Sequence, residues 1–289
     1  NSVTQAVQAT ITLTVNPAGY TNRWDIWVYP AMETPTPPED LIVTTDWREA
    51  LHQLEAGANV LLVPTTSTIN SDTLGTFQPI FWNRITFPQQ KVHTLGTLND
   101  TAHPALAAFP TQRHTSWQWQ TLLDHSKPIV MDTLPKELHP IVQPIDDWND
   151  CRKLGLLFEA TVGQGKLLVC AMDVIHDLNT RPAAKQLYAS LLRYTASEQF
   201  QPPVPIPAAQ FKALFKEPSV LQNLGAQIQS NSEESGYTAR NAIDENPQTL
   251  WHTRWTPTPE PHPHFLQVDL KEPQTIQGLS YLPRQDQSN

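Results

Sequence analysis

Apolar and polar side chains alternate with a period of two along the first thirty residues. The segment ATITLTV (9–15) alternates threonine with apolar residues, and RWDIWVYP (23–30) repeats the pattern after the turn-like NPAG (16–19). This alternation is typical of half-buried strands. Because an isolated hairpin is only marginally stable in water, we expect residues 1–31 to be terminal strands of a β-sandwich that begins before this sequence.

Strand and helix patterns alternate from about residue 40, after a proline-rich connector. LIVTT (41–45) reads as a short strand, and NVLLVP (59–64) reads as a fully apolar strand. Between them, DWREALHQLEAG (46–57) predicts a helix that is capped by Asp46 and ended by Gly57. Such a strand–helix–strand unit implies a mainly parallel, buried sheet with helices on its faces.

Three further apolar segments extend this pattern, at KPIVMDTL (127–134), LGLLFEATV (154–162) and KLLVCAMDV (166–174). The GQG turn between the last two predicts a hairpin. The run 180–200 has apolar residues at helical spacing and predicts an amphipathic helix. Residues 32–200 are therefore expected to form one α/β layer domain, whose pattern resembles flavodoxin-like and glutamine-amidotransferase-like (glutaminase-like) domains.

A second proline-rich stretch separates the α/β domain from the remainder of the chain. The remainder has a different pattern of apolar and polar residues. QPPVPIP opens a predicted linker over residues 201–221. In residues 222–289, FLQVDL (265–270) and TIQGLSYLP (275–283) alternate like strands among many turn formers. The sequence ends too early to close a sandwich of about 100 residues, so we expect only part of a β-sandwich here. The expected fold class is a multidomain α/β plus all-β chain.

Charge and composition narrow the possible partners. The formal net charge is −9, and a nucleic-acid surface needs clustered cations, so nucleic acid is excluded as a partner. No stretch approaches the 18 or so consecutive apolar residues of a membrane-spanning helix, so no membrane insertion is expected. Two cysteines are too few for a disulfide framework or a four-thiolate zinc site.

Three C-terminal segments carry a resemblance to a known family. ARNAIDENPQTLWHTRW (239–255), PHFLQVDL (263–270) and TIQGLSYLPRQD (275–286) follow one another in the order of turn, aromatic, histidine and arginine. This order resembles the first half of discoidin-type domains (the coagulation factor 5/8 C-terminal type), and closely the galactose-binding carbohydrate-binding modules of family 32. The resemblance covers roughly residues 222–289.

The resemblance implies a sugar-binding site. A sugar presents an apolar face and a rim of hydroxyls, so its site needs an aromatic platform together with hydrogen-bonding groups. The family's galactose-binding positions fall on His252, Trp255 and Arg284, and its variable neighbouring loop adds Glu234 and Tyr237. The alternative is that the tryptophan and histidine serve only in packing and capping.

The loop NAIDENPQT resembles the family's calcium loop. The resemblance implies that Asp244 and Thr249 give side-chain oxygens to a structural calcium ion, while Asn241 and Asn246 give carbonyl oxygens. Glu245 stands where the family has glycine, and Asn246 stands where it has aspartate, which removes one charge. The alternative is a plain Asx-type turn.

The α/β domain offers one candidate for catalysis. Glutaminase-like enzymes use a cysteine on a glycine-flanked turn with a histidine and an acid. Cys170 lacks flanking glycines, although His176 follows six residues later, with Asp173 and Asp177 nearby. A buried strand cysteine that acts as a small hydrophobic residue is the favoured interpretation.

The order of the parts resembles the C-terminal accessory region of family 2 glycoside hydrolases of the β-galactosidase kind. The chain has neither the eight strand–helix units nor the carboxylate pair of such a catalytic barrel. We therefore expect a non-catalytic region that binds a galactose-type glycan and contacts other domains of the same polypeptide. The resemblance implies a periplasmic or extracellular location. The alternatives are purely structural buttress domains, or a Cys170–His176 hydrolase or amidotransferase-like activity.

Overall fold

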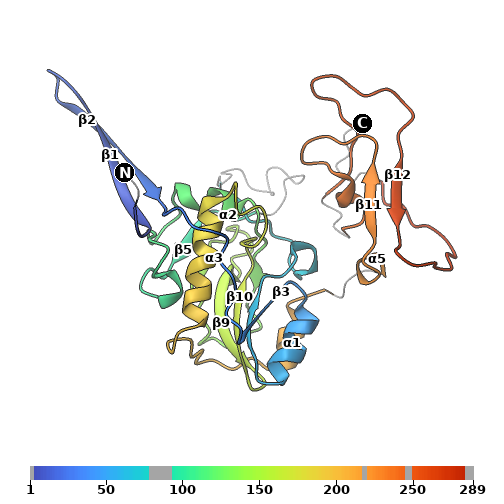
Figure 1. Ribbon diagram of the computed structural model, residues 1–289, viewed down its shortest axis with the longest axis horizontal. Coiled ribbons are helices and arrows are strands. Elements are labelled where there is room, and N and C mark those ends of the chain that lie inside the picture. The colour runs from blue at the N-terminus through green and yellow to red at the C-terminus, as the bar shows by residue number, and fades with distance from the viewer. Residues whose placement is uncertain (1–2, 78–92, 217–219, 245–248, 284–289) are drawn as a thin grey trace. The chain divides into compact units, whose positions relative to one another are not determined.

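The computed structural model describes residues 3–77, 93–216, 220–244 and 249–283. The chain divides into two compact units, Asn1–Phe215 and Lys216–Asn289, which are called unit 1 and unit 2 below. Figure 1 shows both, with unit 1 coloured from blue to yellow and orange and unit 2 from orange to red.

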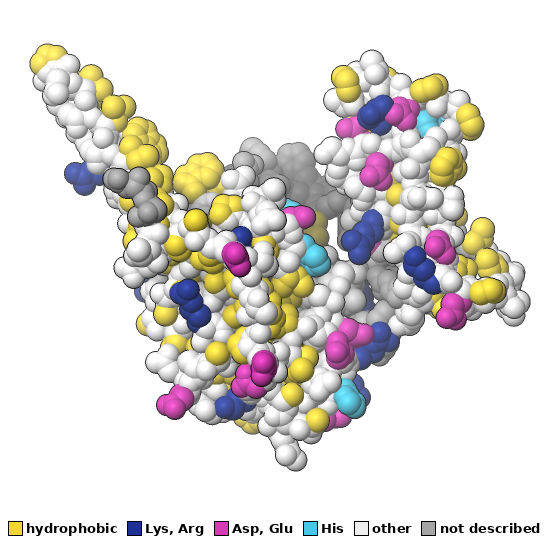
Figure 2. Space-filling model, viewed as in Figure 1, with side chains coloured by type: hydrophobic (Ala, Val, Ile, Leu, Met, Phe, Trp, Pro, Cys, Tyr) yellow, Lys and Arg dark blue, Asp and Glu magenta, His cyan; other side chains and the backbone are white. Residues whose placement is uncertain are grey.

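The predicted N-terminal strands form a hairpin. Strands β1 (Val7–Val15) and β2 (Tyr20–Val28) pair antiparallel as a separate two-stranded sheet. The register places Ile11 opposite Trp24 and Val15 opposite Tyr20, so one face of the hairpin is apolar. These side chains are exposed, and hydrophobic atoms follow the hairpin in Figure 2. Within the described residues no second sheet covers this face, so the sandwich stays a prediction.

A six-stranded sheet forms the centre of unit 1. From one edge to the other, the strands are β3 (Leu41–Thr44), β4 (Asn59–Leu62), β10 (Gly165–Cys170), β9 (Leu157–Val162), β7 (Val142–Pro144) and β5 (Thr97–Asn99). Strands β3, β4 and β10 are parallel, whereas the β10–β9, β9–β7 and β7–β5 pairings are antiparallel. The prediction of a mainly parallel sheet is therefore wrong. Only two residues join β9 to β10, with Gly163 at a φ of 59°, and a parallel pair needs a much longer crossover.

The predicted helices are present in unit 1. Helix α1 (Trp47–Glu55) begins at Asp46, whose carboxylate accepts a hydrogen bond of 2.9 Å from the Arg48 N–H, and Gly57 follows its end with a φ of 91°. Helix α3 (Pro182–Thr195) is mostly buried in the same core. Its leucines face the core, which explains the helical spacing of apolar residues in the sequence.

The apolar segments around the sheet differ in part from the predicted strands. Only β6 (Ile129–Val130) forms within 127–134, and it pairs with β8 (Leu154–Gly155) in a second small sheet. Shorter elements complete unit 1, namely α2 (Gln120–Leu123), α4 (Ala208–Ala213) and the 3-10 turns η1 (Thr66–Thr68), η2 (Pro104–Leu106) and η3 (Trp117–Trp119). Unit 1 is thus a mixed α/β layer, and its flavodoxin-like or glutaminase-like identity stays a prediction.

The predicted linker over 201–221 is corrected, because residues 201–215 pack into unit 1. Strand β9 bonds to this segment on both sides of Pro205, where the Thr161 N–H donates to Val204 O (2.9 Å) and the Ile206 N–H donates to Thr161 O (2.8 Å). Helix α4 buries Phe211 completely, and the ring of Phe215 stacks on Trp47 at 5.9 Å. The prolines end regular structure, but the apolar side chains between them still fill the core.

Unit 2 contains little regular structure. Strands β11 (Gln227–Ser230) and β12 (Leu266–Asp269) pair antiparallel, with α5 (Val220–Asn223) and the turn η4 (Ala239–Ala242) beside them. The predicted strand within 265–270 is confirmed, whereas residues 275–283 form no strand. Leu279 is 94% exposed, because no described strand pairs with this segment.

None of the helices in the described part of the chain has the length and apolar composition that a bilayer crossing needs.

Candidate functional site

Three predicted sugar-binding residues come together in unit 2, and we call Tyr237, His252 and Trp255 the aromatic cluster. The rings of His252 and Trp255 meet edge to face, with centroids 4.5 Å apart, and Tyr237 lies 5.2 Å from Trp255 in a tilted arrangement. Trp255 is 42% exposed and Tyr237 is 37% exposed. The cluster therefore presents a partly open aromatic surface to solvent.

A short turn brings the members of the cluster together. Glu234 and Tyr237 close a turn in which the Tyr237 N–H donates to Glu234 O at 2.9 Å, and Gly236 takes a φ of 81°. The segment at His252 then pairs with this turn twice. The Glu234 N–H donates to His252 O (2.9 Å), and the His252 N–H donates to Tyr237 O (3.1 Å). These backbone bonds fix the backbone positions from which the side chains of Tyr237 and His252 project.

The Glu234 carboxylate holds the segment that carries the tryptophan. Its Oε2 accepts hydrogen bonds from the backbone N–H groups of Trp255 (2.8 Å) and Thr256 (2.9 Å). The Trp255 N–H bond in particular lowers the pKa of Glu234 below its ordinary value of 4.5. The carboxylate is therefore ionised at neutral pH and accepts both bonds as an anion.

The hydrogen bonds of His252 define the form of its ring. Nδ1 lies 2.7 Å from the carbonyl oxygen of Thr253, which accepts only if Nδ1 carries the proton. In the neutral ring Nε2 is then an acceptor for a hydroxyl group. Trp251, which the sequence favoured for packing, donates its indole N–H to Ser232 O at 3.0 Å and lies partly buried.

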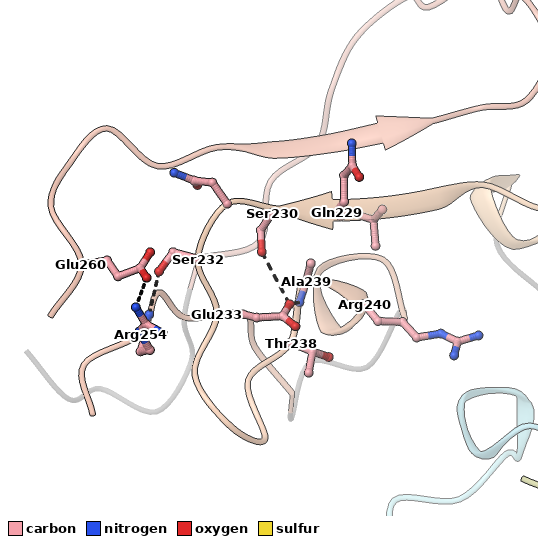
Figure 3. Close-up of a pocket in the computed structure, with 11 residues that line it drawn as sticks. Gln229, Ser230, Ser232, Glu233, Thr238, Ala239, Arg240, Arg254 and Glu260 are labelled. Atoms are coloured by element: carbon pink, nitrogen blue, oxygen red, sulfur yellow. Dashed lines mark hydrogen bonds and ion pairs between the residues drawn. The ribbon is translucent and has the colours of Figure 1, made fainter. Parts of the chain in front are cut away.

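Unit 2 also contains a shallow pocket of about 460 Å³, and Figure 3 shows its lining. Glu233 accepts from the Ala239 N–H at 2.8 Å, and Arg254 forms an ion pair with Glu260. No member of the aromatic cluster lines the pocket, although Arg254 directly precedes Trp255. Sequence reasoning missed this pocket, because it arises where β11 and the loop after it meet the distant segment that carries Arg254 and Glu260.

The predicted calcium ligands are brought together only in part. Asp244 Oδ2 accepts a hydrogen bond of 2.7 Å from the Thr249 hydroxyl, so two of the predicted oxygen ligands are adjacent. The Asn241 side chain donates to Leu250 O at 2.9 Å, so the side chain ties this loop to the segment before Trp251. Asn246 lies outside the described residues, as does the predicted sugar ligand Arg284.

The donor chemistry of this loop fits a hard cation, since carboxylate and hydroxyl oxygens are calcium ligands. In the described ranges, however, no three His, Cys, Asp or Glu side chains converge as a metal site would require. A calcium ion here would depend on backbone carbonyls for most of its ligands.

Comparison with known families covers both units. A family model described as "Domain of unknown function (DUF8487)" matches residues 42–216, which is more than half of the chain. The chain belongs to the DUF8487 family. A second model, described as "F5/8 type C domain", matches residues 227–289, so the aromatic cluster lies within an F5/8 type C (discoidin) domain. The DUF8487 match ends within one residue of the boundary between the two units.

Curated relatives match a short part of this DUF8487 protein. A sialidase from Micromonospora viridifaciens is 46% identical over 52 residues, which is 18% of this chain and 8% of the sialidase. A galactose oxidase from Gibberella zeae is 42% identical over 60 residues, which is 20% of this chain and 9% of the oxidase. The chain thus spans less than a tenth of the length of either relative.

Cys170, one of the two cysteines in the DUF8487 region, is unsuited to nucleophilic catalysis. Cys170 is completely buried at the end of β10, and burial raises the pKa of its thiol to about 12. The thiol lies 3.5 Å from Met172 O. His176 is exposed, and its Nδ1 lies 3.0 Å from Asp173 Oδ1. An activated thiol needs a lowered pKa, so Cys170 fits the favoured role of a small buried hydrophobic residue.

Proposed function

We propose that this chain is a non-catalytic region of a carbohydrate-degrading enzyme, in which the F5/8 type C domain binds galactose-type sugars and the DUF8487 region is a scaffold. The observation that carries the proposal is the convergence of Tyr237, His252 and Trp255 on one partly exposed surface. An aromatic face beside a hydrogen-bond acceptor matches a sugar, which has C–H groups on one face and hydroxyls around its rim.

Each residue of the site has a proposed role. The indole of Trp255 stacks on the apolar face of the sugar, and the ring of Tyr237 limits the platform on one side. Nε2 of His252 accepts a hydrogen bond from a sugar hydroxyl, since Nδ1 is committed to Thr253 O. Arg284, which lies outside the described residues, is proposed as a donor to a second hydroxyl. The similarity to a galactose oxidase supports galactose as the sugar to test first.

We propose that calcium, where it binds, is structural. Asp244 and Thr249 would hold the ion together with carbonyl oxygens of the same loop, including that of Asn241 and, as predicted, that of Asn246. The ion would tie the loop that precedes His252 and would not contact the sugar. Removal of calcium should therefore lower the thermal stability of the F5/8 type C domain more than it lowers sugar affinity.

The N-terminal hairpin supports a role within a larger polypeptide. Its apolar face carries six exposed side chains, namely Ile11, Leu13, Val15, Tyr20, Trp24 and Ile26, while threonines occupy much of the opposite face. Sheets with one apolar face pack against another sheet. We propose that a further β-sheet of the same polypeptide covers this face, that the parent is a family 2 glycoside hydrolase of the β-galactosidase kind, and that it acts in the periplasm or outside the cell.

Such a region works by targeting. A second, weak binding site for the polysaccharide raises the local concentration of substrate at a linked catalytic domain. A direct test is chromatography of the protein on immobilised galactose, with immobilised glucose as the reference. The proposal expects retention on galactose that is lost in Trp255→Ala. Passage of the wild-type protein without retention would instead favour the alternative, in which both units are structural buttresses.

A further inference from the structure

We propose that Glu234 is a positioning residue, which sets the geometry of the aromatic cluster through the backbone and does not itself contact the sugar. The inference rests on the proposed function of the cluster, and it offers an alternative to the expectation that Glu234 adds a direct contact. It starts from the observation that one carboxylate oxygen accepts from two consecutive backbone N–H groups, those of Trp255 and Thr256.

The position of Glu234 in the chain allows this contact to link the parts of the aromatic cluster. Glu234 lies 21 residues before Trp255, on the turn that also carries Tyr237. Its carboxylate therefore joins the turn to the 252–256 segment. The backbone bonds between His252 and the turn fix the histidine and the tyrosine, but they end before Trp255. The carboxylate holds the backbone of the residue that carries the indole.

The chemistry of these bonds is that of a small anion site made by backbone amides. Successive N–H groups that point at one oxygen favour a charged acceptor, and charge-assisted hydrogen bonds are shorter and stronger than neutral ones. The lowered pKa of Glu234 agrees with this arrangement. Arg254 also contributes to it, although its own guanidinium is paired with Glu260.

The consequence for binding is indirect. A sugar that stacks on Trp255 needs the ring at the distance and tilt set by Tyr237 and His252. Without the carboxylate, the 255–256 segment loses two hydrogen bonds, and the ring is then free to leave this arrangement. Preorganisation is lost, and the sugar has to order the loop when it binds.

The experiment compares Glu234→Ala and Glu234→Gln in the full chain. Galactose affinity is measured by calorimetry, and the indole N–H resonance of Trp255 is followed by NMR without sugar, after assignment from its absence in Trp255→Phe. Loss of bonds to a charged acceptor predicts that Glu234→Ala weakens affinity about tenfold or more. Glu234→Gln keeps an accepting oxygen but loses the charge, so it should weaken affinity clearly less than Glu234→Ala does.

The resonance separates positioning from direct contact. The inference predicts a shifted or broadened Trp255 signal in Glu234→Ala without sugar and a smaller change in Glu234→Gln. Glu272→Ala, which removes an exposed carboxylate of the same unit, should change neither readout. Weaker binding with an unchanged Trp255 signal would overturn the inference, because Glu234 would then be a sugar ligand. Equal losses in the glutamine and alanine variants would also overturn it.

The two proposals fail in different ways. If the wild-type protein binds no galactose, the proposed sugar site is wrong, but the Trp255 resonance still tests whether Glu234 holds the cluster. If galactose binds and Glu234→Ala leaves both readouts unchanged, the positioning role is wrong and the sugar site stands. If Glu234→Ala unfolds unit 2, the resolved Trp251 and Trp255 signals are lost together. The comparison of Glu234→Gln with the wild-type protein then tests the positioning role.

Discussion

Replacement of Phe211 by alanine tests whether the proline-rich segment belongs to the core of the DUF8487 region. The side chain is completely buried, its ring lies 5.3 Å from that of Phe215, and Phe215 in turn stacks on Trp47 of helix α1. Truncation of a buried phenylalanine costs about 3–5 kcal/mol. In a domain of this size each kcal/mol lowers the melting temperature by roughly 2–4 °C, so we expect a decrease of roughly 6–20 °C.

The assay is thermal unfolding of the full chain, followed by tryptophan fluorescence, with Lys212→Ala as the matched control. Lys212 lies on the same short helix and is exposed, so its replacement should change stability by less than about 0.5 kcal/mol. The midpoint of the main transition should fall in Phe211→Ala and stay constant in the control. Equal small effects of both substitutions would refute the packing and restore the linker that the sequence predicted.

Two further changes probe the same region. Gly165→Ala should destabilise this region by about 1–3 kcal/mol, because a Cβ at this position would lie 2.6 Å from Ala58 O and 2.7 Å from the Cα of Leu54. A melting temperature equal to that of the wild-type protein would contradict this prediction. An iodoacetamide reaction at pH 8 should modify exposed Cys151 in the native protein and buried Cys170 only after unfolding; rapid native labelling of Cys170 would contradict its assignment as a core residue.

Features encoded over a few neighbouring residues were predictable from the sequence. Asp46 and Gly57 bracket helix α1 as expected, and the turn at Gly163 makes the predicted hairpin. The resemblance to discoidin-type domains placed His252 and Trp255 in one site, and their rings do lie together on one short segment. In each case the physical cause is local: a cap, a positive φ, or a short separation along the chain.

The features that sequence reasoning missed depend on contacts between distant segments. Periodicity does not state which strand pairs with which, so the antiparallel pairings of β7 with β9 and β5 were not foreseen, although the GQG turn predicted the β9–β10 hairpin. Prolines around Val204 read as a linker, yet a segment without regular structure still packs on β9 through its apolar side chains. The contact of Glu234 with the Trp255 backbone spans 21 residues, and its residue type alone gave no sign of it.

Calorimetric titration with galactose most directly tests the central claim that the aromatic cluster binds a sugar. The titration uses the protein with calcium present, alongside His252→Ala and with glucose as the competing sugar. The account predicts saturable heat with galactose that disappears in His252→Ala, while the variant keeps the wild-type melting temperature. No heat from a folded wild-type protein, or equal binding by His252→Ala, would contradict the account.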